Sequence, residues 1–315
     1  MAKKVSIVIP THDRKNAVTR LIQSIKESSM ARHDYEIIVV DDASSDGTAD
    51  VISSRFPDVT LIRNGEEKLV AESRNIGIRA SGSEYIFLVD DDNVLDKRCV
   101  ENLYRCMVED PSIGMAMPII HNFRYPERIG CAGVRRNMIT SFTNGIYRPD
   151  NCSDGTFNET EDCPNAFMCR KAALRKTGIL NSMDYPIHYE EADLGIRMKR
   201  AGFRIVCHPG ARTFHDPGGR NNKLAGRTVH VPMRAYYTGR NRIVFHSMYS
   251  KPWEFALFTF IFYPMIFAFY SYLIIRYSKS WAQRASLLGS YAKGNIDGWL
   301  SAISRPFSTL FPVRS

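Results

Sequence analysis

The sequence lacks several signatures that would place it in a common nucleotide- or metal-binding class. No G-x-G-x-x-G follows its first apolar run and no G-x-x-x-x-G-K-[ST] occurs, which excludes a dinucleotide fingerprint and a P-loop. Its seven cysteines form no C-x-x-C pair, which argues against a structural zinc site and a dense disulfide framework. The chain starts with only a short apolar run, so no signal peptide is expected. If phosphates bind this protein, something other than a glycine-rich loop must neutralise them.

The chain is basic but carries no nucleic-acid motif. It has 315 residues, of which 44% are hydrophobic and 24% charged, and its formal net charge is +9. The basic residues are spread out, so we predict no nucleic-acid partner. The excess charge favours phosphates on small substrates or an anionic membrane face, and a merely soluble basic surface is the plain alternative.

The first hundred residues alternate between strand and helix patterns. Such apolar strands, separated by helices, predict an α/β fold with a mostly parallel sheet that is covered on both faces. The expected strands are VSIVIP, YEIIVVDD, VTLIRN and YIFLVDD, and the expected helices are NAVTRLIQSIKES, SSDGTADVISSRF and LVAESRNIGIRASG.

Polar residues follow three of the expected strands. Ligands of parallel sheets bind beyond the carboxyl ends of the strands, so we expect these residues to converge at one edge. Adjacent carboxylates repel one another and resist leaving water, so a cation is expected beside the third group. Mg²⁺ and Mn²⁺ prefer such oxygen ligands. The three groups are Pro10-Thr11, Asp41-Asp42 and Asp90-Asp91-Asp92.

The rest of the chain is less regular. After short strand-like pieces and a polar loop, residues 188–203 read as an amphipathic helix with acids in its first turn and bases later. Phe255 to Ile275 carries no charge over twenty-one residues, and about 20 apolar residues suffice to span a bilayer. Membrane contact is expected there. A kinked span, a shallow insertion and a helix buried in an oligomer all remain open.

Taken in order, these motifs resemble the inverting glycosyltransferases of family 2, which have the GT-A fold. The resemblance covers roughly residues 4–245. The sequence departs from the family pattern at Asp13, where Asn is usual, and at Glu191, where Asp is frequent. The motifs are VSIVIPTHDR, IIVVDDASSDGT, SRNIGIRASGSEYIFLVDDDN, YEEADLGIRMKRAG, RTFHD and the rhamnosyltransferase-like RAYYTGRNRI.

The resemblance implies a metal-dependent enzyme that moves a single sugar from a nucleotide-diphosphate sugar of UDP, dTDP or GDP type. The acceptor would be a glycan or a polyprenyl-phosphate-linked molecule at the cytoplasmic face of the cell membrane, with a homo-oligomer left open. Residues 1–245 would form the GT-A domain, with a nucleotide-sugar half (1–110) and an acceptor half (111–245). Residues 246–315 would form a helical, membrane-associated tail.

The resemblance also assigns candidate site residues. For the metal, Mn²⁺ or Mg²⁺, these are Asp90, Asp92 and His215, with His208 as a rival histidine. For the general base, the first choice is Glu191, followed by Asp193 and Glu190, although acids at a helix start also meet its dipole favourably. For the nucleotide sugar, the residues are Pro10, Thr11, Arg14, Asp41, Asp42, Arg74, Asn75, Asp90 and Asp91.

Three other functions compete with this interpretation. A sugar-nucleotidyltransferase normally opens with a glycine-rich loop, which IPTHDRKN lacks. A processive polysaccharide synthase carries Q-x-x-R-W and several membrane spans, and neither occurs here. A membrane-docked nucleotide-sugar binder without turnover would not need the full set of acids.

Overall fold

The computed structural model describes residues 3–147, 158–216 and 229–304. Contacts within the chain define two compact units. The first comprises Met1–Arg135, Gly145–Pro186 and Glu190–Gly218, and the second comprises Arg136–Asn144, Ile187–Tyr189 and Gly219–Ser315. The domain boundary expected at residue 245 stays a prediction, and by contacts the second unit already begins before it.

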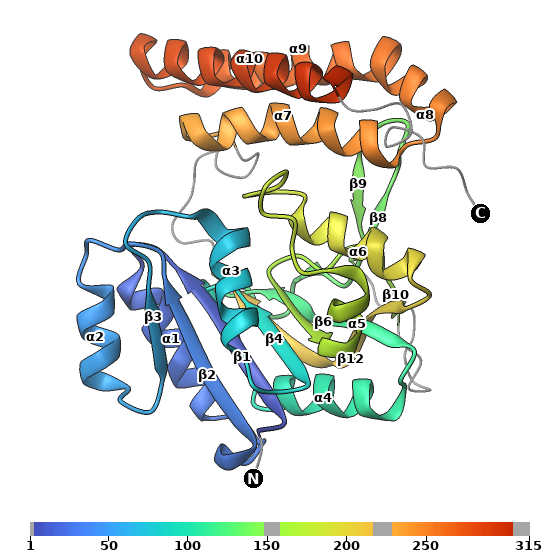
Figure 1. The fold of residues 1–315 in the computed structure, drawn as a ribbon. Helices are drawn as coiled ribbons and strands as arrows, with labels where there is room; N and C mark the ends of the chain where they lie inside the picture. Colours follow the sequence, from blue (N-terminus) through green and yellow to red (C-terminus); the bar gives the residue numbers. More distant parts are fainter. Residues whose placement is uncertain (1–2, 148–157, 217–228, 305–315) are drawn as a thin grey trace. The chain divides into compact units, whose positions relative to one another are not determined.

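Four parallel strands and three helices form the N-terminal half of the first unit (Figure 1). β1 pairs in parallel with β2 and with β4, and β2 pairs in parallel with β3. The predicted alternation of apolar strands and amphipathic helices is confirmed. The strands are β1 (Val5–Thr11), β2 (Tyr35–Asp41), β3 (Thr60–Arg63) and β4 (Tyr85–Val89); the helices are α1 (Lys15–Lys26), α2 (Thr48–Arg55) and α3 (Leu69–Ala80), with a short 3-10 helix η1 (Arg32–Asp34).

The sheet continues with later strands and becomes mixed, in the order β10-β12-β6-β11-β4-β1-β2-β3. β11 is antiparallel to both β4 and β6, whereas β12 is parallel to β6. The predicted parallel arrangement therefore holds from β3 to β4 and ends at β11. The further elements of the first unit are β5 (Asn93–Leu95), α4 (Cys99–Glu109), β6 (Ile113–Asn122), β7 (Ile129–Cys131), β10 (Asn158–Glu159), β11 (Ala166–Arg170), α5 (Lys171–Thr177), α6 (Glu190–Arg200) and β12 (Arg204–His215).

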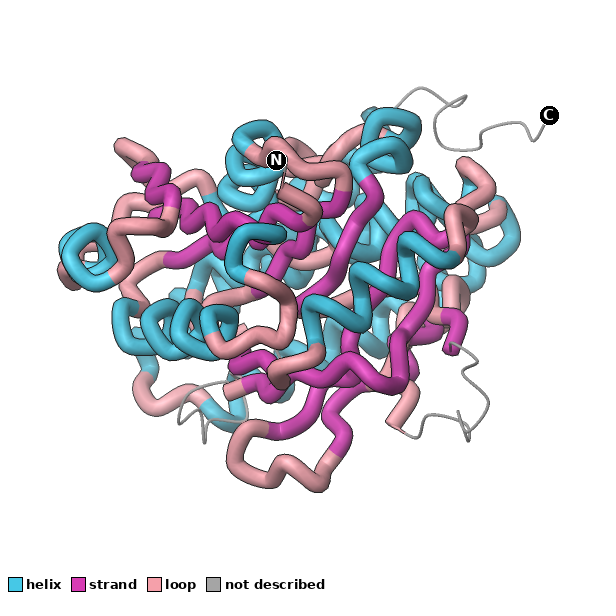
Figure 2. The backbone as a smooth tube through the Cα atoms, turned by 90° about the horizontal axis from the view of Figure 1, so that it is seen from below, coloured by secondary structure: helices cyan, strands magenta, loops and turns pink. Residues whose placement is uncertain are grey.

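Strand β1 shows why the strands are apolar along their whole length. Ile7 belongs to the core on one face of the sheet and Val8 to the core on the other. Figure 2 shows the strands lying together with helices on both sides. A sheet buried on both faces needs apolar residues at every position. Helix α3 lies so close to β1 that a Cβ atom at Gly77 would come within 2.2 Å of Cγ1 of Val8.

The second unit is helical. Helix α10 packs along α7 at Gly294, where a Cβ atom would come within 2.0 Å of the carbonyl oxygen of Tyr236. Two short strands, β8 (Val134–Arg136) and β9 (Thr143–Gly145), form a separate two-stranded sheet with residues from both units. The helices are α7 (Pro232–Tyr249), α8 (Pro252–Leu257), the π-helical turn η4 (Phe258–Phe262), α9 (Tyr263–Tyr277) and α10 (Trp281–Ser304).

The segment from α8 to α9, Pro252–Tyr277, is long and apolar enough to cross a membrane. Only 17% of the most apolar stretch of this segment is buried within the protein. Phe260, with 81% of its surface exposed, and Met265, with 64%, are the most exposed of its large apolar side chains.

Candidate active site

The carboxyl ends of β1, β2 and β4 meet, as the sequence predicted. Thr11 is in register with Asp41 on the neighbouring strand. Its hydroxyl donates a 2.8 Å hydrogen bond to Oδ2 of Asp91, which follows β4. Pro10 precedes Thr11 in the same strand and is also buried. Three polar groups from separate stretches of the chain therefore share one edge of the sheet.

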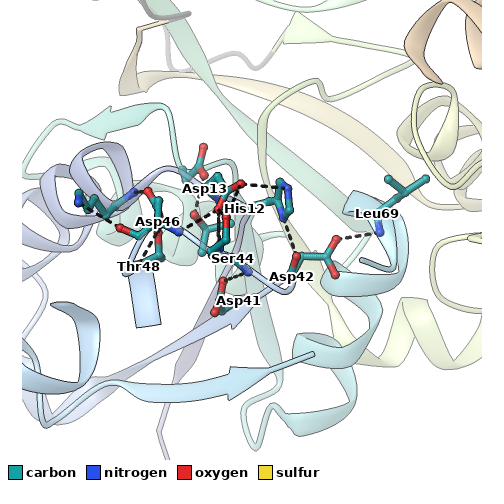
Figure 3. A network of polar contacts seen from close by, with 12 residues as sticks. His12, Asp13, Asp41, Asp42, Ser44, Asp46, Thr48 and Leu69 are labelled. Carbon is teal, nitrogen blue, oxygen red and sulfur yellow. Dashed lines mark hydrogen bonds and ion pairs between the residues drawn. The ribbon is translucent and has the colours of Figure 1, made fainter. Parts of the chain in front are cut away.

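The loops after β1 and β2 are tied to each other by hydrogen bonds (Figure 3). Nδ1 of His12 lies 2.6 Å from the carbonyl oxygen of Asp42. Oδ1 of Asp13 accepts a 2.6 Å hydrogen bond from the backbone N–H of Ser45. Asp13 has a φ of +50°, a conformation that aspartate adopts more readily than most residues. His12 was not among the predicted site residues; its contact joins two loops that are distant in sequence, which no local pattern shows.

Asp41 and Asp42, although adjacent, have different surroundings. Asp42 accepts hydrogen bonds from the backbone N–H groups of Lys68 and Leu69, both at 2.8 Å, and from the side chain of Asn64 at 2.7 Å. Its carboxylate is therefore used in anchoring the start of α3. Oδ2 of Asp41 is buried, accepts no hydrogen bond and lies 3.4 Å from Nε of Arg63.

An open pocket adjoins this pair of aspartates. It is lined by Ala43, Arg63, Asn64 and Gly65. Arg63 and Asn64 contact Asp41 and Asp42, respectively. Of the two aspartates predicted to meet a nucleobase, Asp41 is the one with an acceptor oxygen that no hydrogen bond occupies.

The three consecutive aspartates are separated by the cations they meet. Asp90 receives a 2.5 Å hydrogen bond from Nη2 of Arg74. Nη1 of Arg14 lies 3.1 Å from Oδ1 of Asp91 and 2.8 Å from Oδ2 of Asp92. Two arginines thus offset the repulsion between these acids. The sequence had suggested both arginines for the site, but not that they would divide the aspartates between them.

Asp92 also lies beside His215, at the end of β12. Oδ1 of Asp92 is buried without a hydrogen bond and is 3.4 Å from Nε2 of His215. Burial raises the pKa of Asp92, but His215 and Arg14 lower it to about 2. Burial dominates at Asp91 and raises its pKa to about 7.

Asp92 and His215 fit a divalent metal ion whose other ligands come from the phosphates of a substrate. Carboxylate and imidazole groups suit Mn²⁺, and such metals take one or two protein ligands plus substrate phosphates. Within residues 3–147, 158–216 and 229–304, no three His, Cys, Asp or Glu side chains form a complete cage. Asp90, whose Oδ1 binds Arg74, stays a predicted ligand. His208 lies at a bulge in β12, where its Nδ1 accepts a hydrogen bond from the N–H of Gly210.

Arg74 connects the aspartates to the start of α6. Its side chain is 1% exposed, and its Nη1 lies 2.9 Å from Oε1 of Glu191 and 3.2 Å from Oε1 of Glu190. Nη2 of the same guanidinium binds Asp90. One buried cation therefore holds three carboxylates. The sequence predicted a ligand contact for Arg74 and gave no sign of its pairing with acids more than a hundred residues away.

The two glutamates have raised pKa values. Burial is the main cause for both, and the charge of Arg74 opposes it; the charge of Glu190 further raises the pKa of Glu191. Oε2 of Glu190 is buried and accepts no hydrogen bond. Asp162 adds a further negative charge near both glutamates, and no motif in the sequence pointed to it.

Two other predicted residues have contacts elsewhere. Asp193 lies 2.6 Å from Nη2 of Arg197, which also donates hydrogen bonds to the carbonyl groups of residues 177–179. The side chain of Asn75 donates to the carbonyl oxygen of Leu180 at 2.8 Å and accepts from its N–H at 3.1 Å. These contacts hold loops in place. The structure therefore brings Glu190 and Glu191, rather than Asp193, to the Arg74 cluster.

A mixed sheet with this topology, with acids and basic side chains at the carboxyl ends of its strands, defines the GT-A class of fold. Residues 6–178, more than half of the chain, match glycosyl transferase family 2. The chain belongs to that family.

Comparison with curated proteins supports the same family. The chain is 36% identical over 117 residues to the poly(ribitol-phosphate) beta-N-acetylglucosaminyltransferase TarP of Staphylococcus aureus, covering 35% of each chain. It is 33% identical over 109 residues to an uncharacterized glycosyltransferase of Haemophilus influenzae, covering 35% of this chain and 36% of the relative. The matches thus span about a third of these relatives.

Among solved structures, the mannosyltransferase PcManGT from Pyrobaculum calidifontis, in complex with GDP-Man and Mn²⁺, has a similar fold. The TM-score is 0.55 at 15% identity, and the alignment covers 94% of this chain and 88% of the other. This similarity concerns the fold, which extends over most of both chains.

Proposed function

We propose that this protein is an inverting, metal-dependent glycosyltransferase that moves one sugar from a nucleotide-diphosphate sugar to an acceptor hydroxyl. The observation that carries the proposal is the position of Arg74 between Asp90 and the pair Glu190-Glu191. The acids at the sheet edge suit the donor, and the glutamates suit the acceptor. The fold and the family membership support the same assignment.

The donor would bind at the edge formed by β1, β2 and β4. The free oxygen of Asp41 and the pocket beside Arg63 suit the N–H groups of a uracil, thymine or guanine base. Arg14, which already lies beside Asp91 and Asp92, suits the diphosphate as a charge-assisted donor. Asp92 and His215 would hold the metal, which, when bound, stabilises the negative charge of the departing diphosphate.

Glu191 would act as the general base. Its carboxylate would take the proton of the acceptor hydroxyl while the acceptor oxygen forms a bond to the anomeric carbon. The bond from that carbon to the diphosphate oxygen breaks with its electron pair, which inverts the configuration. Arg74 would hold Glu191 in place and favour its ionised form, because a nearby positive charge favours the charged form.

The acceptor would be a glycan or a polyprenyl-phosphate-linked molecule at the cytoplasmic membrane face. The motivation is the exposed apolar segment Pro252–Tyr277. Side chains such as Phe260 would lie among the headgroups and upper acyl chains of the bilayer, as in interfacial amphipathic helices.

The donor site is tested by thermal shift against a panel of nucleotide sugars, with Mn²⁺, with Mg²⁺ and with chelator. A ligand that binds the native state raises its apparent stability. We expect a rise with one nucleotide class that needs the metal and is lost in Asp92→Asn. The exposed surface variant Asp50→Asn, on α2, should behave as wild type.

A product assay with the best donor tests the reaction itself. Release of a nucleoside diphosphate supports sugar transfer, whereas release of pyrophosphate would indicate nucleotidyl transfer. Metal-independent donor binding that is unchanged in Asp92→Asn would contradict the proposed metal site.

A further inference from the structure

The second unit has a large excess of positive charge. Residues 219–315 contain thirteen lysines and arginines but only two acids, Glu254 and Asp297. Glu254 accepts a hydrogen bond from the backbone N–H of Lys251 at 2.8 Å. Asp297 accepts one from the hydroxyl of Tyr236, also at 2.8 Å. Both acids therefore have local partners, and the sequence of this stretch supplies few acids for its many cations.

Arg242, on α7, is a cation of this unit whose hydrogen-bond partners are tyrosine hydroxyl groups. Its Nη2 donates to the hydroxyl of Tyr270 at 3.1 Å, and its Nε donates to the hydroxyl of Tyr189 at 3.4 Å. The guanidinium carbon also lies 4.8 Å from the centre of the Tyr270 ring. Nη1 is buried and has no hydrogen-bond partner.

No ion pair between the residues that the structure describes includes Arg242; the side chains that act most strongly on its charge are Tyr189, Tyr270 and Tyr291. Tyrosine is uncharged at neutral pH, so these residues supply hydrogen bonds and ring faces but no countercharge. Burying part of a charged guanidinium costs free energy unless an anion pairs with it.

His188 lies in the same positive field. Burial lowers its pKa to about 3, together with the charges of Arg234, His230 and Arg242. Its ring is therefore neutral, and its Nε2 is buried without a hydrogen-bond partner. Nη1 of Arg242 and Nε2 of His188 are thus two buried polar nitrogens without a hydrogen-bond partner.

The backbone that carries His188 is held in an unusual conformation. His188 has a φ of +66° and Tyr189 a φ of +72°. The side chain of Asn241, next to Arg242 in α7, donates to the carbonyl oxygens of Ile187 at 2.8 Å and His188 at 3.2 Å. Consecutive non-glycine residues in this region cost of order 1–3 kcal/mol each and are typical of functional sites.

We propose that Arg242 and His188 form a binding site for a phosphate or diphosphate group. A phosphate offers the oxygens that a guanidinium fork binds and a neutral imidazole N–H can donate to. The further cations around the pair favour a group with more than one negative charge. Both residues of the site belong to the second unit.

The occupant follows from the proposed function, on which this second step rests. His188 and Tyr189 directly precede Glu190 and Glu191 in the chain. The same unit exposes the apolar segment Pro252–Tyr277. We infer that the bound group is the phosphate or diphosphate of a lipid-linked acceptor, which would bring the acceptor to the proposed base.

The test measures binding of inorganic pyrophosphate to the full chain by calorimetry in the presence of EDTA, which silences the metal-dependent donor site. We expect saturable binding that Arg242→Gln weakens at least tenfold, the worth of one charge-assisted contact. The control Lys293→Gln removes the same charge from an exposed position of α10, outside the apolar segment, and should bind within about twofold of wild type. His188→Asn should fall between the two.

Vesicles distinguish a lipid phosphate from a free one. Phosphatidylcholine vesicles carrying phosphatidic acid, which has a phosphate monoester, should bind wild type more tightly than vesicles with the same fraction of phosphatidylglycerol. This preference should be lost in Arg242→Gln and kept in Lys293→Gln. Binding of pyrophosphate without any preference among vesicles would overturn the lipid-linked source while leaving the anion site.

Other results would overturn the site itself. These are no saturable pyrophosphate binding, or equal weakening in Arg242→Gln and Lys293→Gln, which would indicate bulk surface charge. If Arg242→Gln does not fold, Arg242→Lys keeps the charge without the planar fork and should still bind several-fold more weakly than wild type. The proposed donor binding requires the metal and Asp92, whereas pyrophosphate binding is measured in EDTA. A failure to bind pyrophosphate would therefore leave the proposed transferase function intact.

Discussion

Each compact unit contains an arginine with a buried guanidinium nitrogen, and the two arginines differ in what neutralises them. Arg74 in the first unit binds Asp90, Glu190 and Glu191. Arg242 in the second unit binds two tyrosine hydroxyl groups and no acid among the described residues. The first arginine completes a site from within the protein, whereas the second leaves a positive charge for a ligand to complete. The five changes below test this difference, from the largest expected effect to the smallest.

Removing the proposed base should have the largest effect. Glu191→Gln keeps the shape of the side chain but cannot accept a proton, and general-base catalysis contributes about 10²- to 10⁴-fold. We expect kcat to fall by that factor while donor affinity stays within a few-fold. Steady-state assays of nucleoside diphosphate release measure this. Activity retained in Glu191→Gln would move the base elsewhere, and the exposed variant Glu67→Gln should be unaffected.

Removing the first arginine should destabilise the protein strongly. Arg74→Met leaves three carboxylates without their shared cation, and breaking a buried ion pair costs about 3–5 kcal/mol. Denaturant unfolding monitored by circular dichroism measures the change. Arg79→Met, from the exposed end of the same helix, should cost less than about 1 kcal/mol. Equal losses in the two variants would show that Arg74 is not the electrostatic centre of the site.

The pH dependence of activity should reflect the same cluster. Burial raises the pKa of Glu191, so its carboxylate becomes protonated at a higher pH than an ordinary glutamate. Since a base must be ionised to act, kcat should decline as the pH falls toward this raised pKa. Arg74 lowers that pKa, so Arg74→Gln should move the decline to higher pH. A profile that is unmoved in Arg74→Gln would contradict the assignment of Glu191.

The apolar segment of the second unit should contribute to vesicle binding. Phe260→Ser removes an exposed ring, and losing its insertion should weaken binding to anionic vesicles by about tenfold. Met183→Ser, which changes an equally exposed apolar side chain in the first unit, should have no effect. Sedimentation with vesicles measures both. Equal binding by wild type and Phe260→Ser would indicate that this segment does not face lipid.

Removing the second arginine should have the smallest effect on stability. Arg242→Met takes away a charge that has no countercharge, and replacing such a group by an apolar one is often neutral or stabilising. The free energy of unfolding without phosphate should stay within about 1 kcal/mol of wild type or rise. A loss as large as that expected for Arg74→Met would show that Arg242 is a structural element and would abolish the contrast between the units.

Sequence patterns predicted what depends on neighbours along the chain. The apolar runs that end in Thr11, Asp41 and Asp90 predicted both the strands and their shared edge, because the carboxyl ends of parallel strands meet. The change to a mixed sheet at β11 was not predicted, since strand direction depends on pairing between distant segments. The second unit's helices were only partly anticipated, from one long apolar run.

The division of labour among the site residues depends on contacts across the fold. Asp193 lies in the same helical turn as Glu191, but its i, i+4 pairing with Arg197 assigns it to a loop contact. That spacing is visible in the sequence and offered a signal that sequence reasoning left unused. The link from Arg74 to Glu190 joins residues more than a hundred positions apart, and no local pattern encodes it.

The missing side chain of Gly77 has a consequence for the chemistry one turn away. Because α3 touches β1 at that position, the height of the helix above the sheet is fixed, and with it the reach of the guanidinium that Arg74 extends. A methyl group at position 77 would push α3 away from the sheet and weaken the contacts of Arg74 with all three carboxylates. The position of the proposed base, Glu191, thus depends partly on the absence of a Cβ atom at Gly77.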